Sequence, residues 1–316
     1  MKTIREYIEE MLLYKESIGY CRHTYEYELG RFCNFIESKM LDATSLTEDF
    51  VLNWCTRRDS ETQTGARKRF QVIREFLKYL SAIGVDCYVI PSHFIPRQET
   101  RTPYIFTDNE LTHIFRECDT LKSSHNSPHR HLILPVLLRL IYFCGLRPNE
   151  GRELKSEEIN FDKGVLHIRK NKTGKERYVA MSPDVLQMCK EYQNAAMSIF
   201  ADRTYFFPSP SGAPFGRRWL SGQFRKIWQN IRKIGNESNA VVYDLRHRYA
   251  TAVMMKWLDE GADIYAKLPY LSAYMGHSKF SDTAYYIHLL PEKLIRSTAI
   301  DWSRFSDIIP EVSDDE

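Results

Sequence analysis

The chain has 316 residues, enough for two domains of ordinary size with a core each. Its longest apolar run, from Leu132 to Gly145, contains Pro135 and Arg139 and is too short to cross a bilayer, and the charged start carries no apolar signal segment. Seven cysteines without a CxxC pair fit neither a disulfide framework nor a zinc site, and a formal net charge of +3 does not by itself establish a polyanionic partner, so we expect a soluble, cytoplasmic protein with reduced thiols.

Residues 1 to about 90 carry apolar side chains at helical spacing in successive segments joined by short turns. The pattern Ser45-x-x-Glu48 resembles a capping box and predicts a helix that continues through Phe50 and Trp54. We therefore predict a small helical bundle over residues 1–90. Its apolar positions are Ile4, Ile8, Met11, Leu12, Leu29, Phe32, Phe35, Ile36, Phe70, Ile73, Phe76, Leu77 and Leu80.

The last helix of this bundle is basic, because Arg67, Lys68, Arg74 and Lys78 flank its apolar stripe. A solvated helix face explains such charges as well as a DNA contact does. Both explanations stay open for this segment.

Residues 91–106 show no helical period and contain three prolines together with Arg97 and Arg101, so we predict an extended linker here. A second capping box, Thr107-x-x-Glu110, then predicts the start of a new helical run. The domain boundary is expected within this linker.

The second domain, residues 107–290, is mixed in its predicted structure. The run that ends near Cys144 is apolar on every side and predicts a buried helix. The segments "VLHIRK" and "ERYVAM" alternate around "NKTG" and predict a β-hairpin. The fold class is therefore mostly α with a small β-hairpin or sheet, an α+β domain after a helical bundle. A later helical stretch is basic and contains Arg217, Arg218, Arg225, Lys226, Arg232 and Lys233.

Arg147 and Glu150 lie in the segment "CGLRPNEGREL", where a glycine ends the buried helix and Pro148 suits the first turn of the next one. Glu150 follows three residues after Arg147 and can orient the guanidinium from the same helical face. A surface ion pair is the alternative explanation for this pair.

Tyr243, Arg246 and His247 lie at positions i, i+3 and i+4 in "YDLRHRYAT" and share one side of a helix. An arginine so placed needs an acceptor, which a phosphate would supply. Lys172 in the hairpin turn is either solvated or functional. The segment "MGHSKFSDTAYYIH" adds His277 and the pair Tyr285 and Tyr286, whose hydroxyls belong either to a nucleophile or to core aromatics.

Taken in order, these segments resemble the tyrosine recombinase family, also called the phage integrases, in the two-domain layout of Xer enzymes. The resemblance covers residues 107–290 and implies that the helical bundle is a core-binding domain that clamps DNA. It places Lys172, not Lys175, on the catalytic lysine and selects Tyr286 over Tyr285 as the nucleophile. The catalytic residues that it implies are Arg147 with Glu150 as its supporting acid, Lys172, Tyr243, Arg246, His277 and Tyr286.

One position departs from the family pattern, because the second arginine box normally begins with histidine and here begins with Tyr243. That histidine is assigned to proton transfer from the nucleophile. Tyr243 would keep a hydrogen bond to the phosphate, and His247, one helical turn away, is the other candidate for taking the proton. The long connection between Arg246 and His277 resembles transposon-encoded members of the family.

The resemblance implies site-specific DNA recombination or integration of a mobile element, through a 3′-phosphotyrosyl intermediate and a Holliday junction. Such chemistry requires neither ATP nor a metal, and we expect no cofactor. The expected partners are double-stranded recombination sites and further copies of the chain, as a tetramer on DNA, alone or with sister recombinases. The candidate DNA contacts are Arg67, Lys68, Arg74, Lys78, Arg97, Arg101, Arg217, Arg218 and Arg225.

Three other functions stay open. A type IB topoisomerase shares this catalytic pocket, and a non-cleaving DNA-binding regulator would explain Tyr243 as the sign of a decayed site. A metal hydrolase that uses His125, His129 and His131 is weakly supported, since these residues have no carboxylate nearby.

Residues 291–316 end in an acidic tail and place apolar side chains near helical spacing. A helix here either covers its own domain or docks onto a neighbouring protomer, and we expect the second. We also expect no arm-binding domain before the helical bundle. The apolar residues are Leu294, Ile295, Ala299, Trp302, Phe305 and Ile308.

Overall fold

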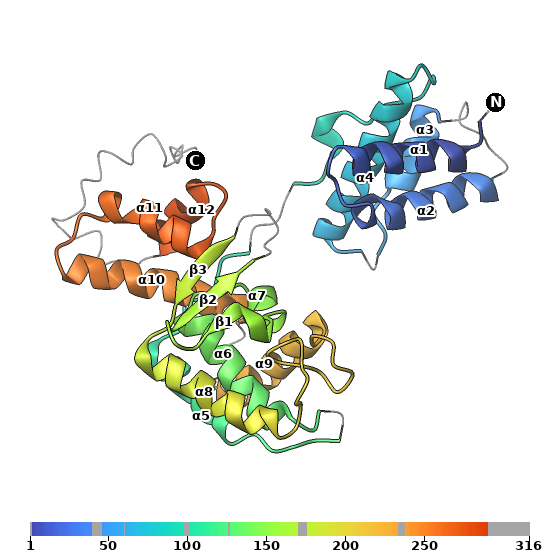
Figure 1. Cartoon of the computed structure of the whole chain (residues 1–316). Helices are drawn as coiled ribbons and strands as arrows, with labels where there is room; N and C mark the ends of the chain where they lie inside the picture. The colour runs from blue at the N-terminus through green and yellow to red at the C-terminus, as the bar shows by residue number, and fades with distance from the viewer. Residues whose placement is uncertain are drawn as a thin grey trace. The chain divides into compact units, whose positions relative to one another are not determined.

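The computed structural model describes residues 2–39, 46–59, 61–97, 101–125, 127–169, 176–232 and 238–289. Contacts within the chain divide it into two compact units, Met1–Arg101 and Thr102–Glu316 (Figure 1). No helix in the described ranges is both long enough and apolar enough to span a membrane.

The first unit is a helical bundle with its own core. Thr3 begins the first helix with a complete capping box, and apolar faces from all its α-helices meet in one buried cluster that includes Phe32, Trp54 and Phe76. Phe32 packs against Trp54 with ring centroids 5.4 Å apart. The elements are α1 (Ile4–Ser17), α2 (His23–Ser38), α3 (Glu48–Cys55), α4 (Gln63–Ala82) and the 3₁₀ turn η2 (Ser92–Phe94).

The capping box predicted at Ser45 is wrong. Helix α3 begins at Glu48, and Thr47, whose backbone is extended, is its N-cap residue. Glu48 is therefore the first helical residue and cannot reach back from the third position, as a capping box requires. Ser45 itself lies outside the described residues. The predicted helix through Phe50 and Trp54 is confirmed.

The second unit is mostly helical. Thr107 and Glu110 form the predicted capping box at the start of α5, with both reciprocal hydrogen bonds present. The helices are α5 (Asp108–Asp119), α6 (Arg130–Phe143), α7 (Pro148–Arg152), α8 (Pro183–Met197), α9 (Arg217–Ile231), α10 (Tyr243–Asp259), α11 (Ile264–Met275) and α12 (Ser281–Ala284), with the 3₁₀ turns η3 (Ser156–Glu158) and η4 (Tyr285–Leu289).

A three-stranded antiparallel sheet joins these helices, in the order β1 (Ile159–Asn160), β2 (Val165–Ile168) and β3 (Arg177–Ala180). The predicted hairpin is confirmed as β2 paired with β3, with Leu166 opposite Val179 and Ile168 opposite Arg177. The turn between them, residues 170–175, lies outside the described residues.

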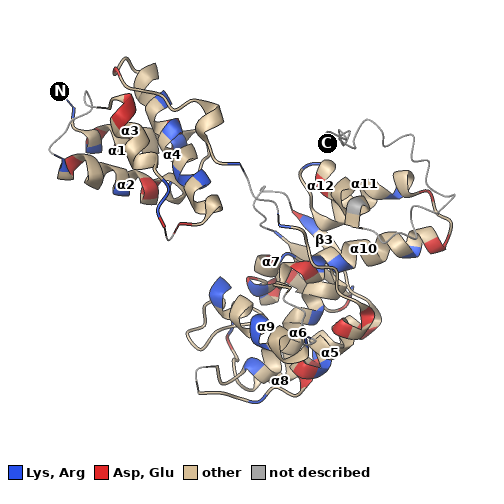
Figure 2. Ribbon diagram, turned by 180° about the vertical axis from the view of Figure 1, so that it is seen from behind, with Lys and Arg blue, Asp and Glu red and all other residues tan. Residues whose placement is uncertain are grey.

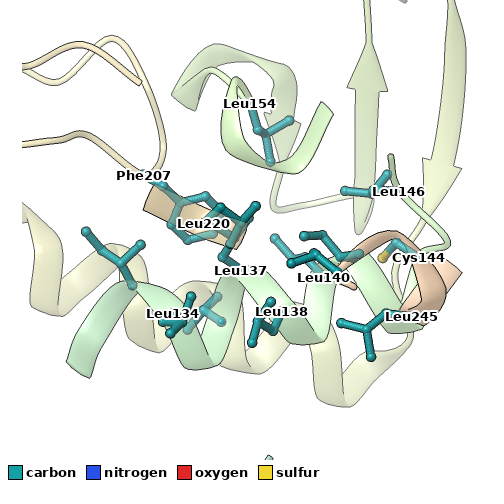
Figure 3. Packing of buried hydrophobic residues seen from close by; sticks show 14 of the residues in the cluster. Leu134, Leu137, Leu138, Leu140, Cys144, Leu146, Leu154, Phe207, Leu220 and Leu245 are labelled. Carbon is teal, nitrogen blue, oxygen red and sulfur yellow. The ribbon is translucent and has the colours of Figure 1, made fainter. Parts of the chain in front are cut away.

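Helix α6 is the centre of the main core, as its uniformly apolar sequence predicts. It contacts α5, α7, α8 and α10, so it carries the elements that surround the candidate site. Figure 3 shows the packing of Leu134, Leu137, Leu138, Leu140, Cys144, Leu146, Leu154, Phe207, Leu220 and Leu245.

A second, smaller buried cluster lies between α10, α11 and η4. It contains Met254, Leu268, Met275, Tyr286 and Ile287. The C-terminal described elements of the chain therefore pack on α10 through a core of their own, separate from the cluster around α6.

Candidate active site

Arg147 lies in the turn that follows α6. Gly145 adopts a left-handed conformation with φ +59° there, and a Cβ at this position would lie 2.6 Å from Cδ1 of Tyr249, so both the turn and its close packing require glycine. Arg147 is the N-cap residue of α7, and Pro148 is the first helical residue. The Arg147 backbone N–H and Nη1 each donate to Glu150 over 2.8 Å. Nη2 of Arg147 donates to the Gly276 carbonyl over 2.5 Å.

Arg246 lies within α10 and is fully buried. Its Nη1 donates to the Gly145 carbonyl and its Nη2 to the Met275 carbonyl, each over 2.7 Å. Among the described residues, its buried Nε has no hydrogen-bond partner. The guanidinium is thus fixed by two backbone carbonyls and keeps donor capacity for a further acceptor.

Arg177 is a third arginine beside Arg147 and Arg246, and it was not among the site residues predicted from the sequence. Its two Nη atoms donate to the two oxygens of Glu150 over 2.9 and 2.7 Å, and its Nε donates to the Tyr274 carbonyl over 2.8 Å. A signal was available, because strand β3 alternates buried and exposed residues and Arg177 falls on the buried face together with Val179. A charge on such a face needs a partner.

The carboxylate of Glu150 lies at the centre of these arginines. Burial opposes its ionisation, but the hydrogen bonds and charge of Arg177, followed by the hydrogen bonds from Arg147, lower the pKa of Glu150 to about 2. The surface ion pair considered for Arg147 and Glu150 is therefore excluded, since the Glu150 side chain is only 4% exposed.

Tyr286 and Tyr285 differ sharply in exposure. Tyr286 is 2% exposed within the small cluster on α10, whereas Tyr285 is 41% exposed. The Tyr286 ring lies between two histidines, with centroids 5.5 Å from His247 and 5.9 Å from His277. Burial raises the pKa of Tyr286 to about 12, although the charge of Arg246 acts in the opposite direction.

His277 follows the glycine that ends α11, and its Nδ1 lies 2.7 Å from Oγ1 of Thr283. Thr283 is fully buried and holds the imidazole in place. Burial, together with the charges of Arg246 and Arg147, lowers the pKa of His277 to about 3, so the ring is neutral at pH 7.

Tyr243 is the first residue of α10 and is 38% exposed. Its ring centroid lies 5.0 Å from that of His247. The structure thus brings together Arg147, Glu150, Tyr243, Arg246, His247, His277 and Tyr286, while Lys172 lies outside the described residues.

Basic residues lie along α4 (Figure 2), and their contacts differ from one another. Arg67 donates to the Pro96 carbonyl over 2.6 Å and Arg74 to the Ile90 carbonyl over 2.7 Å, so both hold the following segment against the helix. Lys68 is exposed, and Lys78 is exposed beside Glu75. A DNA contact by each of the four stays a prediction.

The remaining candidate DNA contacts are exposed to solvent. They are Arg97 and Arg101 near the boundary between the two units, and Arg217, Arg218 and Arg225 on α9. The histidines of the metal hydrolase alternative do not gather: within the described ranges, no three His, Cys, Asp or Glu side chains are placed to hold a metal ion.

Known proteins resemble this chain over most of its length. A putative integrase/recombinase of Sinorhizobium fredii is 28% identical over 298 residues, which cover 90% of this chain and 92% of that protein. The tyrosine recombinase XerC of Staphylococcus saprophyticus is 23% identical, covering 92% of this chain and 95% of that one.

Two solved structures share the fold. The integrase of transposon Tn1549, in complex with transposon right-end DNA, gives a TM-score of 0.65 at 14% identity and covers 96% of this chain and 99% of its own. The XerH site-specific recombinase bound to a palindromic difH substrate gives 0.65 at 18% identity, covering 89% and 80%.

The match to the phage integrase family model spans residues 105–293, which is more than half of the chain and includes every candidate residue around Glu150. The chain belongs to the phage integrase family, the tyrosine recombinases, which break and rejoin DNA strands.

Proposed function

We propose that this enzyme recombines specific DNA sites of a mobile element, and that Tyr286 is its nucleophile. The observation that carries this proposal is the position of Tyr286. This buried tyrosine lies beside the fully buried Arg246 and close to the rings of His247 and His277. A buried aromatic that served only for packing would not need this polar neighbourhood.

In the reaction, the Tyr286 Oη forms a bond to the phosphorus of one DNA phosphodiester, and the bond to the 5′-oxygen breaks. The tyrosine proton passes to a base, and Lys172 returns a proton to the departing 5′-oxygen. The product is a 3′-phosphotyrosyl enzyme that keeps the ester bond for rejoining. Attack by the 5′-hydroxyl of a partner strand reverses these steps and yields the Holliday junction.

Arg147 and Arg246 stabilise the negative charge that develops on the non-bridging oxygens. Both guanidiniums are held by backbone carbonyls of the protein before DNA arrives, and each keeps N–H groups that these carbonyls do not use. Donors fixed in advance need no reorganisation in the transition state, which is the main way in which such sites lower barriers. Arginine also stays charged at any working pH.

His247 is the proposed proton acceptor for Tyr286. The position where the family has histidine is Tyr243, at the solvent-exposed start of α10, whereas the ring centroid of His247 lies 5.5 Å from that of Tyr286. The His277 ring centroid also lies near that of Tyr286, at 5.9 Å, but the low pKa of His277 makes it a weak base, so we assign it to the phosphate.

The test uses a duplex obtained by selecting the protein's own binding site from a randomised library. A nick placed next to the scissile phosphate lets the short 5′-product strand diffuse away and traps the covalent complex. The wild-type protein should accumulate a protein–DNA adduct without added metal or ATP. Binding without any adduct would indicate the non-cleaving regulator, and relaxation of supercoiled plasmids that lack the site would indicate a topoisomerase.

A further inference from the structure

Glu150 accepts hydrogen bonds from two arginines at once. Its Oε1 accepts from Nη1 of Arg147 and Nη1 of Arg177, and its Oε2 accepts from the Arg147 backbone N–H and Nη2 of Arg177. Each oxygen thus has two donors, which uses the full capacity of a carboxylate. The carboxylate cannot rotate toward Arg147 without breaking the two-pronged pair with Arg177, so Arg177 sets the plane in which Arg147 is held.

The charges around this carboxylate are not balanced one to one. Arg147, Arg177 and Arg246 carry three positive charges, and Glu150, within 4.0 Å of all three, carries one negative charge. Because Arg177 forms the bidentate pair, two positive charges are left for an anion. Without Arg177, the same carboxylate would neutralise Arg147.

Arg177 also fixes the end of α11. The last three carbonyls before His277 each accept from a different arginine: Tyr274 from Arg177, Met275 from Arg246 and Gly276 from Arg147. The carbonyls at a helix C-terminus lack partners within the helix and carry partial negative charge, so guanidinium groups suit them.

Arg177 packs closely against the backbone at Gly276, where α11 ends. A Cβ at Gly276, where φ is +66°, would lie 2.9 Å from Nη1 and 3.1 Å from Cδ of Arg177. The arginine is packed against the backbone that leads directly to His277. Strand β3 is thereby linked to the element that presents His277 to Tyr286.

Arg177 does not itself reach the substrate. Its side chain is 7% exposed, and Nε, Nη1 and Nη2 each already donate to the protein. We propose that Arg177 is a positioning residue, which acts through Glu150 and the α11 C-terminus to align Arg147 and His277 for the attack by Tyr286. The inference rests on the proposed function, and the experiment separates the two.

The experiment measures single-turnover adduct formation on the nicked duplex and, separately, the Kd for the intact duplex. Arg177→Lys keeps the charge and loses the bidentate fork. We expect its adduct rate to fall on the order of 10²-fold, because displacing reacting groups by about 1 Å has effects of this size, while Kd changes less than about threefold. The matched control is Arg152→Lys, at a buried arginine of α7 that contacts the Phe215 carbonyl instead.

A double-mutant cycle tests the route through Glu150. If Arg177 acts through this carboxylate, Arg177→Lys should cost little more in a Glu150→Gln background than Glu150→Gln costs alone. Multiplicative losses would overturn the route through Glu150, and an Arg177→Lys protein that cleaves at the wild-type rate would overturn the whole inference.

A second variant separates a loss of positioning from a loss of folding. The double variant Arg177→Gln with Glu150→Gln removes both members of the buried bidentate pair, so neither Arg177 nor Glu150 is left as a buried charge without the other. It should melt as a folded protein and bind the duplex, yet form the adduct on the order of 10²-fold more slowly. A wild-type rate would contradict the positioning role. Failure of wild-type protein to form any adduct would instead contradict the proposed function.

Discussion

Arg246 is a charged side chain with no exposure to solvent, and within the described ranges its nearest carboxylate partner is Glu150, 4.0 Å away. Burying a charge without full pairing is costly, typically by several kcal/mol. The two carbonyls at Gly145 and Met275 offset part of this cost. A site that retains such a residue gains most when an anion completes its coordination, which is what a DNA phosphate would do.

The two arginines of the site should therefore behave as transition-state residues. Replacing Arg147 or Arg246 by Lys supplies a point charge without the planar fork, and we expect single-turnover cleavage to fall on the order of 10²-fold or more, with much weaker effects on duplex binding. Cleavage within a few-fold of wild type in both variants would rule out the arginine clamp.

We propose that Tyr243 and His247 divide the roles that a single histidine has in the family pattern. We predict that Tyr243→His is tolerated or activating, because it restores an imidazole next to the scissile phosphate, and that Tyr243→Ala is impaired. His247→Ala should lower cleavage further than Tyr243→Ala if His247 accepts the proton. The measurement is the pH dependence of adduct formation. Unchanged cleavage by Tyr243→Ala would place that residue outside the site.

At the level of single residues, the sequence identified site residues best where several motifs follow one another in a fixed order. Arg147, Arg246, His277 and Tyr286 were singled out by the order of their motifs and by the resemblance to the tyrosine recombinases that this order carries. Arg177 and Thr283 were missed because their roles depend on which face of a strand or turn is buried, and on partners more than 20 residues away or across a short helix. The sequence pattern around each residue does not identify the partners in such contacts.

Elements with a distinct sequence pattern were predictable. The buried helix α6 is confirmed from its uniformly apolar run, the hairpin β2–β3 from its alternating strands, and the basic helix α9 from its sequence. The start of the five-residue helix α7 was indicated by Pro148, whereas α12 and η4, four and five residues long, offer no period to recognise. These short elements nonetheless carry Glu150, Thr283 and Tyr286.

The hairpin provides a test at the scale of one element. Residues 170–175, which include Lys172, lie in the sequence between β2 and β3, and β3 begins with Arg177, which contacts Glu150. If Lys172 protonates the leaving 5′-oxygen, then Lys172→Ala should regain most of its cleavage rate on a substrate with sulfur at that position, since a thiolate leaves without an acid. Equal impairment on the oxygen and sulfur substrates would mean that Lys172 only positions the phosphate.

On the scale of the whole molecule, the division into two units matters for DNA. A chain with a helical unit before its catalytic unit can contact a duplex through both, and the exposed arginines of α9 and the exposed lysines of α4 are among the predicted contact residues. Which of the basic residues contact DNA is not predictable from the sequence, because charge patterns do not separate a solvated face from a phosphate contact.

The segment 291–316 lies outside the described residues, and its predicted role is assembly. Strand exchange joins two duplexes with two protomers on each, so we propose a tetramer on DNA in which this segment docks onto the neighbouring protomer. Deleting residues 291–316 should leave single-site binding intact and abolish recombination and cooperative pairing. Synaptic tetramers of the truncated protein in analytical ultracentrifugation would show that another surface couples the protomers.

The proposed function depends above all on Tyr286 being the residue that breaks the DNA strand. The most direct measurement is adduct formation on the nicked duplex by Tyr286→Phe and by its matched neighbour Tyr285→Phe, with peptide mapping of the wild-type adduct. Tyr286→Phe removes one oxygen and should form no adduct while binding the duplex almost as well as wild type. Tyr285→Phe should form it normally, and the mapped phosphotyrosine should be residue 286. An adduct formed by Tyr286→Phe but not by Tyr285→Phe would show that Tyr286 is not the nucleophile.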